Sequence, residues 1–135
     1  MARDYAFRAA LDVPYKEALK KIEAALKTEG FGILTSVDMQ ATLKEKLGAQ
    51  FRKYGILGAC NPPLAQKALA QDLEVGLVLP CTIVVYEDDG GSFVSIADPM
   101  AVVELLGNAA LRPIAQEAQA KLKRVLKALP ERGRP

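Results

Sequence analysis

A run of turn-forming residues, Asp-Asp-Gly-Gly at positions 88–91, separates two β-rich segments and limits the fold more than any other feature of the chain. Asp and Gly tolerate the left-handed backbone conformations that tight hairpin turns require. The pattern therefore predicts that residues 81–87 and 93–98 are neighbouring antiparallel strands. A sheet that contains this hairpin cannot be wholly parallel.

Two segments have the apolar spacing of amphipathic helices. In residues 14–29 and again in residues 109–129, apolar side chains recur at steps of three and four along one side. Pro14 suits the first turn of a helix, where no N–H bond is lost, and Gly30 is a typical left-handed C-cap. We therefore expect two long helices.

The remaining segments indicate an α+β fold, because strands and helices are mixed without the regular alternation of a parallel α/β fold. Residues 5–11 alternate in polarity as a half-buried strand does. Further strands are expected at residues 31–37 and 51–60, a helix at 61–72, and a short helix or an extended excursion at 39–47.

These elements predict one domain, residues 1–130, followed by a frayed polar tail, residues 131–135. The domain should contain a mostly antiparallel sheet of about five strands with two long helices packed on one face.

The absence of histidine restricts the chemistry. It removes the Ser-His-Asp and Cys-His nucleophile systems, in which an imidazole takes the proton. It also removes the common zinc sites that need histidine ligands. Acid–base catalysis would have to use Asp, Glu, Lys, Tyr or Cys, so we lean towards a protein that is not an enzyme; no catalytic residue and no cofactor is indicated.

Charge and hydropathy give no sign of a nucleic-acid or membrane partner. The net charge is +2, and the basic residues are interleaved with acidic ones. The longest apolar stretch, residues 75–86, is interrupted and falls short of the roughly 20 residues that span a bilayer. The first eleven residues lack the apolar segment of a secretion signal. We expect a cytoplasmic protein.

Cys60 and Cys81 are the residues best suited to carry a reaction or to bind a metal. Cys60 precedes Asn61 and Pro62, which mark a helix start, so its thiol would face the positive end of a helix and have a lowered pKa. A reactive thiolate and a soft-metal ligand are the functional interpretations; a small buried residue is the structural one. With Cys81, a disulfide, a two-thiolate metal site or a redox couple are the alternatives.

Asn61 and Asp98 precede the prolines of expected helices, and helix capping is the ordinary explanation of both residues. They complete the candidate site because they flank the same segments as the two cysteines.

Three segments together carry a family resemblance: Leu-Gly-Ala-Cys-Asn-Pro at 57–62, Leu-Pro-Cys at 79–81 and Ala-Asp-Pro at 97–99. In these segments, and in the opening strand and helix, the chain resembles the family called domain of unknown function 302 over essentially its whole length. The resemblance implies a five-stranded sheet with two long helices, similar in topology to one repeat of the TATA-binding protein fold. It implies no activity, and likeness of fold does not carry DNA binding across.

Three functions are compatible with this sequence. The first is a non-enzymatic binding module that holds a small ligand or a soft metal near Cys60, Asn61, Cys81 and Asp98; a helix N-terminus would favour an anionic ligand. The second is a thiol-based redox protein or enzyme that uses Cys60, with Cys81 as the resolving residue. The third is an assembly protein whose function is its own dimer interface.

A homodimer is expected because residues 75–85 are apolar on both alternating sets of side chains. A sheet covered by helices on one face would expose one of these sets, and large exposed apolar patches usually mark interfaces. The alternative is that residues 75–79 are an internal connection packed within their own domain.

Overall fold

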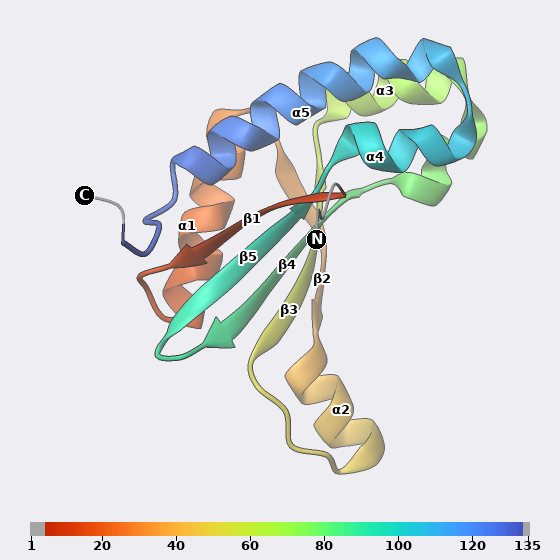
Figure 1. The fold of residues 1–135 in the computed structure, drawn as a ribbon. Helices are drawn as coiled ribbons and strands as arrows, with labels where there is room; N and C mark the ends of the chain where they lie inside the picture. The colour runs from red at the N-terminus through yellow and green to blue at the C-terminus, as the bar shows by residue number, and fades with distance from the viewer. Residues whose placement is uncertain (1–4, 134–135) are drawn as a thin grey trace.

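The computed structural model describes residues 5–133, and Figure 1 shows the arrangement of its elements. In chain order they are β1 (Ala6–Leu11), α1 (Tyr15–Thr28), β2 (Gly32–Asp38), α2 (Met39–Leu47), β3 (Tyr54–Cys60), α3 (Pro62–Gln71), the 3₁₀ segment η1 (Leu73–Val78), β4 (Cys81–Asp88), β5 (Gly91–Ala97), α4 (Pro99–Val103), the 3₁₀ segments η2 (Glu104–Leu106) and η3 (Ala109–Leu111), and α5 (Arg112–Lys127).

The five strands form one antiparallel sheet in the order β1-β5-β4-β3-β2, which confirms the α+β prediction. The hairpin that the turn residues predict joins β4 to β5, and Asp88 lies opposite Gly91. Asp89 and Gly90 have φ values of 43° and 81°, the left-handed conformations that such a turn requires.

The two long helices pack on one face of the sheet, where the main hydrophobic cluster lies. Strands β4 and β5 direct alternate apolar side chains into this cluster, and α1 and α5 cover them with their apolar sides. Figure 1 shows α5 crossing from the end of the sheet towards α1. The fully buried apolar side chains of these four elements are Ala18, Ile22, Leu26, Ile83, Val85, Val94, Ile96, Leu122 and Val125.

The opposite face of the sheet carries a row of aromatic rings. Tyr54 stacks on Tyr86 with ring centroids 5.6 Å apart, and Tyr86 stacks on Phe93 at 5.4 Å. The rings lie opposite one another in the β3–β4 and β4–β5 registers, so they are cross-strand pairs that stabilise the sheet.

A second hydrophobic cluster lies beyond the end of the sheet, where α3, η1, α4 and the start of α5 lie together (Figure 1). Its buried members are Ala68, Val75 and Leu111. Here the structure differs from the alternating pattern read for residues 75–85. The first part of that run is the 3₁₀ segment η1, and Asp72 caps it by accepting a hydrogen bond from the Glu74 N–H at 2.9 Å.

The C-terminal residues pair with the end of β1 at its edge of the sheet. Glu131 forms a β-bridge with Leu11, and the N–H of Arg132 donates to the carbonyl of Ala10 at 2.7 Å. Residues 131 and 132 were expected to fray but are held by these backbone bonds; residues 134–135 lie outside the described residues.

The β2 edge is open by contrast. All but one of its residues are exposed, Leu34 has 66% of its surface accessible, and the following helix α2 has no buried residue. Within residues 5–133, no helix is both long enough and apolar enough to cross a membrane.

Candidate functional site

A largely apolar cavity of about 300 Å³ lies between the end of the sheet and the second cluster. Its floor comes from the ends of β3, β4 and β5, and its walls come from α3, η1, α4 and α5. Leu77 and Thr82 are exposed lining residues and mark where the cavity meets solvent. The lining includes Cys60, Asn61, Leu64, Val75, Val78, Cys81, Val102, Val103, Leu111, Ile114, Ala115 and Ala118.

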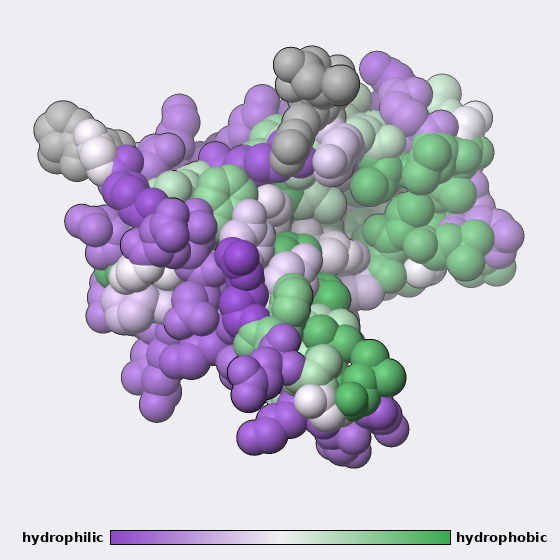
Figure 2. Space-filling view, turned by 60° about the horizontal axis from the view of Figure 1, so that its bottom comes forward, coloured by the Kyte–Doolittle hydropathy of each residue, from purple (hydrophilic) through white to green (hydrophobic). Residues whose placement is uncertain are grey.

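Figure 2 shows that the surface on this side of the molecule is apolar, in the green area at the right, where η1 and α4 lie in Figure 1. Leu73, Leu77 and Leu105 each have more than three quarters of their surface accessible there. Leu77 also lines the cavity, so apolar surface continues from the lining to the exterior, as is typical of a binding site.

The two cysteines both line this cavity, as their sequence motifs suggested, and both are free thiols. Cys81 begins β4 opposite Ala59 and packs against the main cluster, whereas Cys60 ends β3. Burial, and to a smaller extent the nearby Cys60, raise the pKa of Cys81 to about 11. Cys81 is therefore a neutral thiol at physiological pH, which disfavours it as a nucleophile or resolving thiolate.

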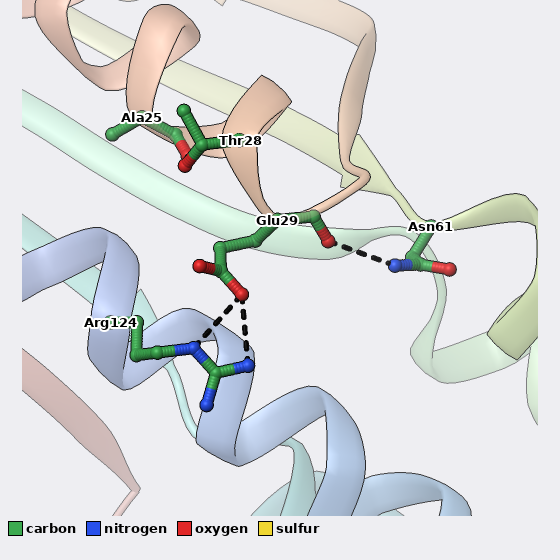
Figure 3. A network of polar contacts seen from close by, with 5 residues as sticks. All are labelled: Ala25, Thr28, Glu29, Asn61 and Arg124. Carbon is green, nitrogen blue, oxygen red and sulfur yellow. Dashed lines mark hydrogen bonds and ion pairs between the residues drawn. The ribbon is translucent and has the colours of Figure 1, made fainter.

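Asn61 is a buried connector between two helices. Its Oδ1 accepts a hydrogen bond from the Leu64 N–H at 3.3 Å, which caps α3, and its Nδ2 donates to the carbonyl of Glu29 at 3.2 Å. Figure 3 shows Glu29 between Asn61 and Arg124, whose guanidinium binds the Glu29 carboxylate at 2.9 and 3.0 Å. That ion pair lowers the pKa of Glu29. The Asn61 amide thus makes one hydrogen bond to the protein through its nitrogen and one through its oxygen.

The N-terminus of α3 offers no N–H group to a ligand at its first four positions. Pro62 and Pro63 have no backbone N–H, the N–H of Leu64 is bound by Asn61 Oδ1, and that of Ala65 is bound by the Asn61 carbonyl at 2.9 Å. This geometry removes the reason for expecting an anion there, because anion binding at helix termini depends on free N–H groups.

Asp98 does not line the cavity, unlike the other three candidate residues. It caps α4 by accepting from the Met100 N–H at 2.9 Å, and both its carboxylate oxygens accept from Gln119 Nε2, at 3.1 and 3.2 Å. Its role in the structure is to hold α4 against α5, which are the two helices that wall the cavity.

A metal site finds little support in this arrangement. Among the residues that the structure describes, no group of three or more His, Cys, Asp and Glu side chains is placed to hold an ion. Two thiols would therefore have to bind a soft ion without a third ligand of these types.

The fold and the site can be compared with known families. The family described as "Domain of unknown function DUF302" matches residues 7–129. The chain belongs to this family. A solved DUF302 structure from Bacillus stearothermophilus, described as an uncharacterized conserved protein, is 30% identical and has a TM-score of 0.87, covering 94% of this chain and 99% of that chain. No curated protein matches the chain.

In this DUF302 chain, most of the cavity wall was not identified from the sequence. Val75 and Val78 belong to the apolar run at residues 75–86, but neither was placed at the site, and Val102 and Val103 were not expected there. A wall of aliphatic side chains looks like core in a sequence. The connection from Asp72 to Pro80 could have indicated the position of Val75 and Val78, because it lies between Cys60 and Cys81 in the sequence and leads directly to Cys81.

The DUF302 cavity can do little chemistry on its own. Its described lining has no charged side chain, and its polar side-chain groups are two thiols, one hydroxyl and an amide that is already hydrogen-bonded. Such a site can bind and shield a molecule, and the two thiols are the side chains of its described lining that acid–base or nucleophilic chemistry could use.

Proposed function

We propose that the chain is a non-enzymatic binding protein that holds a small molecule in the cavity between the sheet end and the second cluster. The observation that carries this proposal is an apolar cavity of about 300 Å³ that remains open where two hydrophobic clusters meet. Pockets of this kind, with a few polar groups, are the usual binding sites of small molecules.

The size of the cavity supports binding over a packing accident. A sealed empty cavity costs about 24 cal/mol per Å³, so about 300 Å³ would cost about 7 kcal/mol. That figure is an upper bound, since solvent reaches this cavity at its mouth, but it is comparable to the stability of a whole domain, about 5–15 kcal/mol. A ligand that fills the space would recover part of this cost.

Native mass spectrometry of protein purified without denaturation tests this proposal. We expect a species with added mass in the wild type and its loss in Ala115→Leu, which places three extra carbons in the cavity. Leu47→Lys, at an exposed position of α2 outside the cavity lining, is the control and should keep the added mass. A wild-type spectrum without added mass, together with no binding of the probe compounds described below, would contradict the proposal.

A thiol enzyme is the weaker alternative, because the pKa of Cys81 is raised to about 11 and the thiol is held neutral. Cys60 remains the residue on which such an activity would depend. The variant Cys60→Ser separates the two functions: it should abolish a thiol-dependent reaction but leave binding of an apolar molecule largely intact.

A homodimer is the second candidate function, and the open β2 edge favours it. An edge strand presents unpaired backbone N–H and C=O groups, and most proteins protect such edges with charges or covering segments. Here Leu34 and Val37 are exposed on β2, whereas the end of the β1 edge is bonded to residues 131–132. Antiparallel pairing of two β2 strands about a two-fold axis would use the same edge of both copies and would therefore give a closed dimer.

Light scattering at increasing concentration tests the dimer. We expect the mass of two chains for the wild type, the mass of one chain for Leu34→Lys, and no change for the matched variant Leu73→Lys at another exposed leucine. A constant mass of one chain at all concentrations would rule out this dimer.

A further inference from the structure

The cavity lacks any group that would neutralise a charged ligand. None of its lining residues, all within the described part of the chain, is Lys, Arg, Asp or Glu, and the chain has no histidine. Most of the wall is aliphatic. A ligand that carried a charge into this space would lose its hydration without gaining a counter-charge, which is strongly unfavourable.

Dipoles and hydrogen-bonding groups do not replace the missing charges. The first four positions of α3 have no available N–H, because two are prolines and two are bound by Asn61. The Asn61 amide itself is bound to Leu64 and Glu29. The polar side-chain groups that remain are the two thiols and the hydroxyl of Thr82, which is exposed.

From this lining we infer that the ligand of the cavity is a neutral, predominantly apolar small molecule whose polar group, where it has one, lies near Thr82 at the mouth. The inference rests on the proposed binding function and specifies its ligand class. Anions, cations and free metal ions are outside this class, including the anionic ligand that the helix start suggested.

Three compounds with one alkyl chain and different head groups test the ligand class: 1-octanol, octanoate and octylammonium. Each is titrated by calorimetry into the full-length protein at pH 7.5, below its aggregation concentration. We expect 1-octanol to bind at least ten times more tightly than either charged compound. Because the chain is constant, the comparison isolates the charge of the head group.

Two variants that fill the cavity test whether 1-octanol binds inside it. Ala115→Leu and Ala118→Leu should each weaken 1-octanol binding about tenfold or more, while Leu47→Lys, at an exposed position of α2 outside the cavity lining, should leave it unchanged. Circular dichroism confirms that each variant is folded, and the second cavity variant serves if the first does not fold. Retention of wild-type affinity in a folded cavity variant would overturn the assignment.

The outcomes separate this inference from the function on which it rests. Binding of octanoate or octylammonium as tightly as 1-octanol, with loss in the cavity variants, would overturn the neutral class but keep the binding function. Absence of binding by all three compounds would count against both, and the native mass spectrum would then show whether a ligand of another shape is retained.

Discussion

Replacing Ala115 by leucine tests whether the space beside α5 is an open cavity. Ala115 is buried, faces the cavity and belongs to neither hydrophobic cluster. Leucine adds three carbons, and burial of each is worth about 0.8 kcal/mol, so filling could add up to about 2.4 kcal/mol to the free energy of unfolding. Incomplete fit should reduce the observed gain to about 1–2 kcal/mol.

The same substitution in a closely packed site has the opposite sign. Ala18 in α1 is fully buried within the main cluster, so Ala18→Leu should lower the free energy of unfolding by about 1–3 kcal/mol through overpacking. Both positions lie inside long helices, and alanine and leucine are both good helix formers, so helix propensity contributes little to the difference.

Urea and thermal unfolding measure both changes. For a chain of 135 residues, a gain of about 1–2 kcal/mol should raise Tm by about 3–7 °C. Protein freed of ligand must be used, because a bound molecule would stabilise the wild type alone. A loss of stability in Ala115→Leu as large as that in Ala18→Leu would refute the reasoning, since it would mean that the space does not exist in solution.

Three other predictions concern packing, capping and pH. A Cβ on Gly55 would lie 2.6 Å from the hydroxyl of Tyr15, so Gly55→Ala should cost about 1–3 kcal/mol in urea unfolding, whereas Gly32→Ala, with nothing within 4 Å, should be close to neutral. Asn61→Ala removes a helix cap and the donor to the partly buried carbonyl of Glu29, which should lower the free energy of unfolding by about 1–2 kcal/mol in the same assay. Because the pKa of Cys81 rises from 9.0 to about 11 on folding, the unfolded chain releases this thiol proton first. Its stabilisation, on the order of 2 kcal/mol, is present below pH 9 and is lost as pH rises to 11. This loss should be absent in Cys81→Ala, and equal pH profiles for the two proteins would contradict it.

The fold was predictable where the signals are local. The turn at 88–91 specified the central hairpin, and apolar steps of three and four specified α1 and α5. Strand ends were less certain: β3 begins at Tyr54, although the β-rich composition extends back to Phe51. Composition records a preference, whereas the end of a strand depends on where its neighbour stops, and β4 pairs no further than Tyr54.

The site was only partly predictable. Cys60, Asn61 and Cys81 were chosen together from motifs, and all three line one cavity. The aliphatic wall was not foreseen, because the residues of η1 and α4 have the same composition as a strand core. Their position depends on the path of the chain through the 3₁₀ segments, and the spacing of apolar residues in the sequence does not predict that path.

The two prolines at 62–63 affect both the start of α3 and the hydrogen-bond donors available there. As a helix starter, Pro62 correctly placed the beginning of α3. Both prolines lack N–H groups, so they also weaken the anion site that a helix start suggests.

The strand order has a consequence for how the chain reaches this structure during synthesis. β1 is the first strand to leave the ribosome, but its partner is β5, the last, so it stays unpaired until residues 91–97 have emerged. Its outer edge waits longer still, for residues 131–132. The β2–β3–β4 meander can form earlier from nearby segments. Closure of the sheet therefore joins segments far apart in the sequence, and such non-local pairing slows folding.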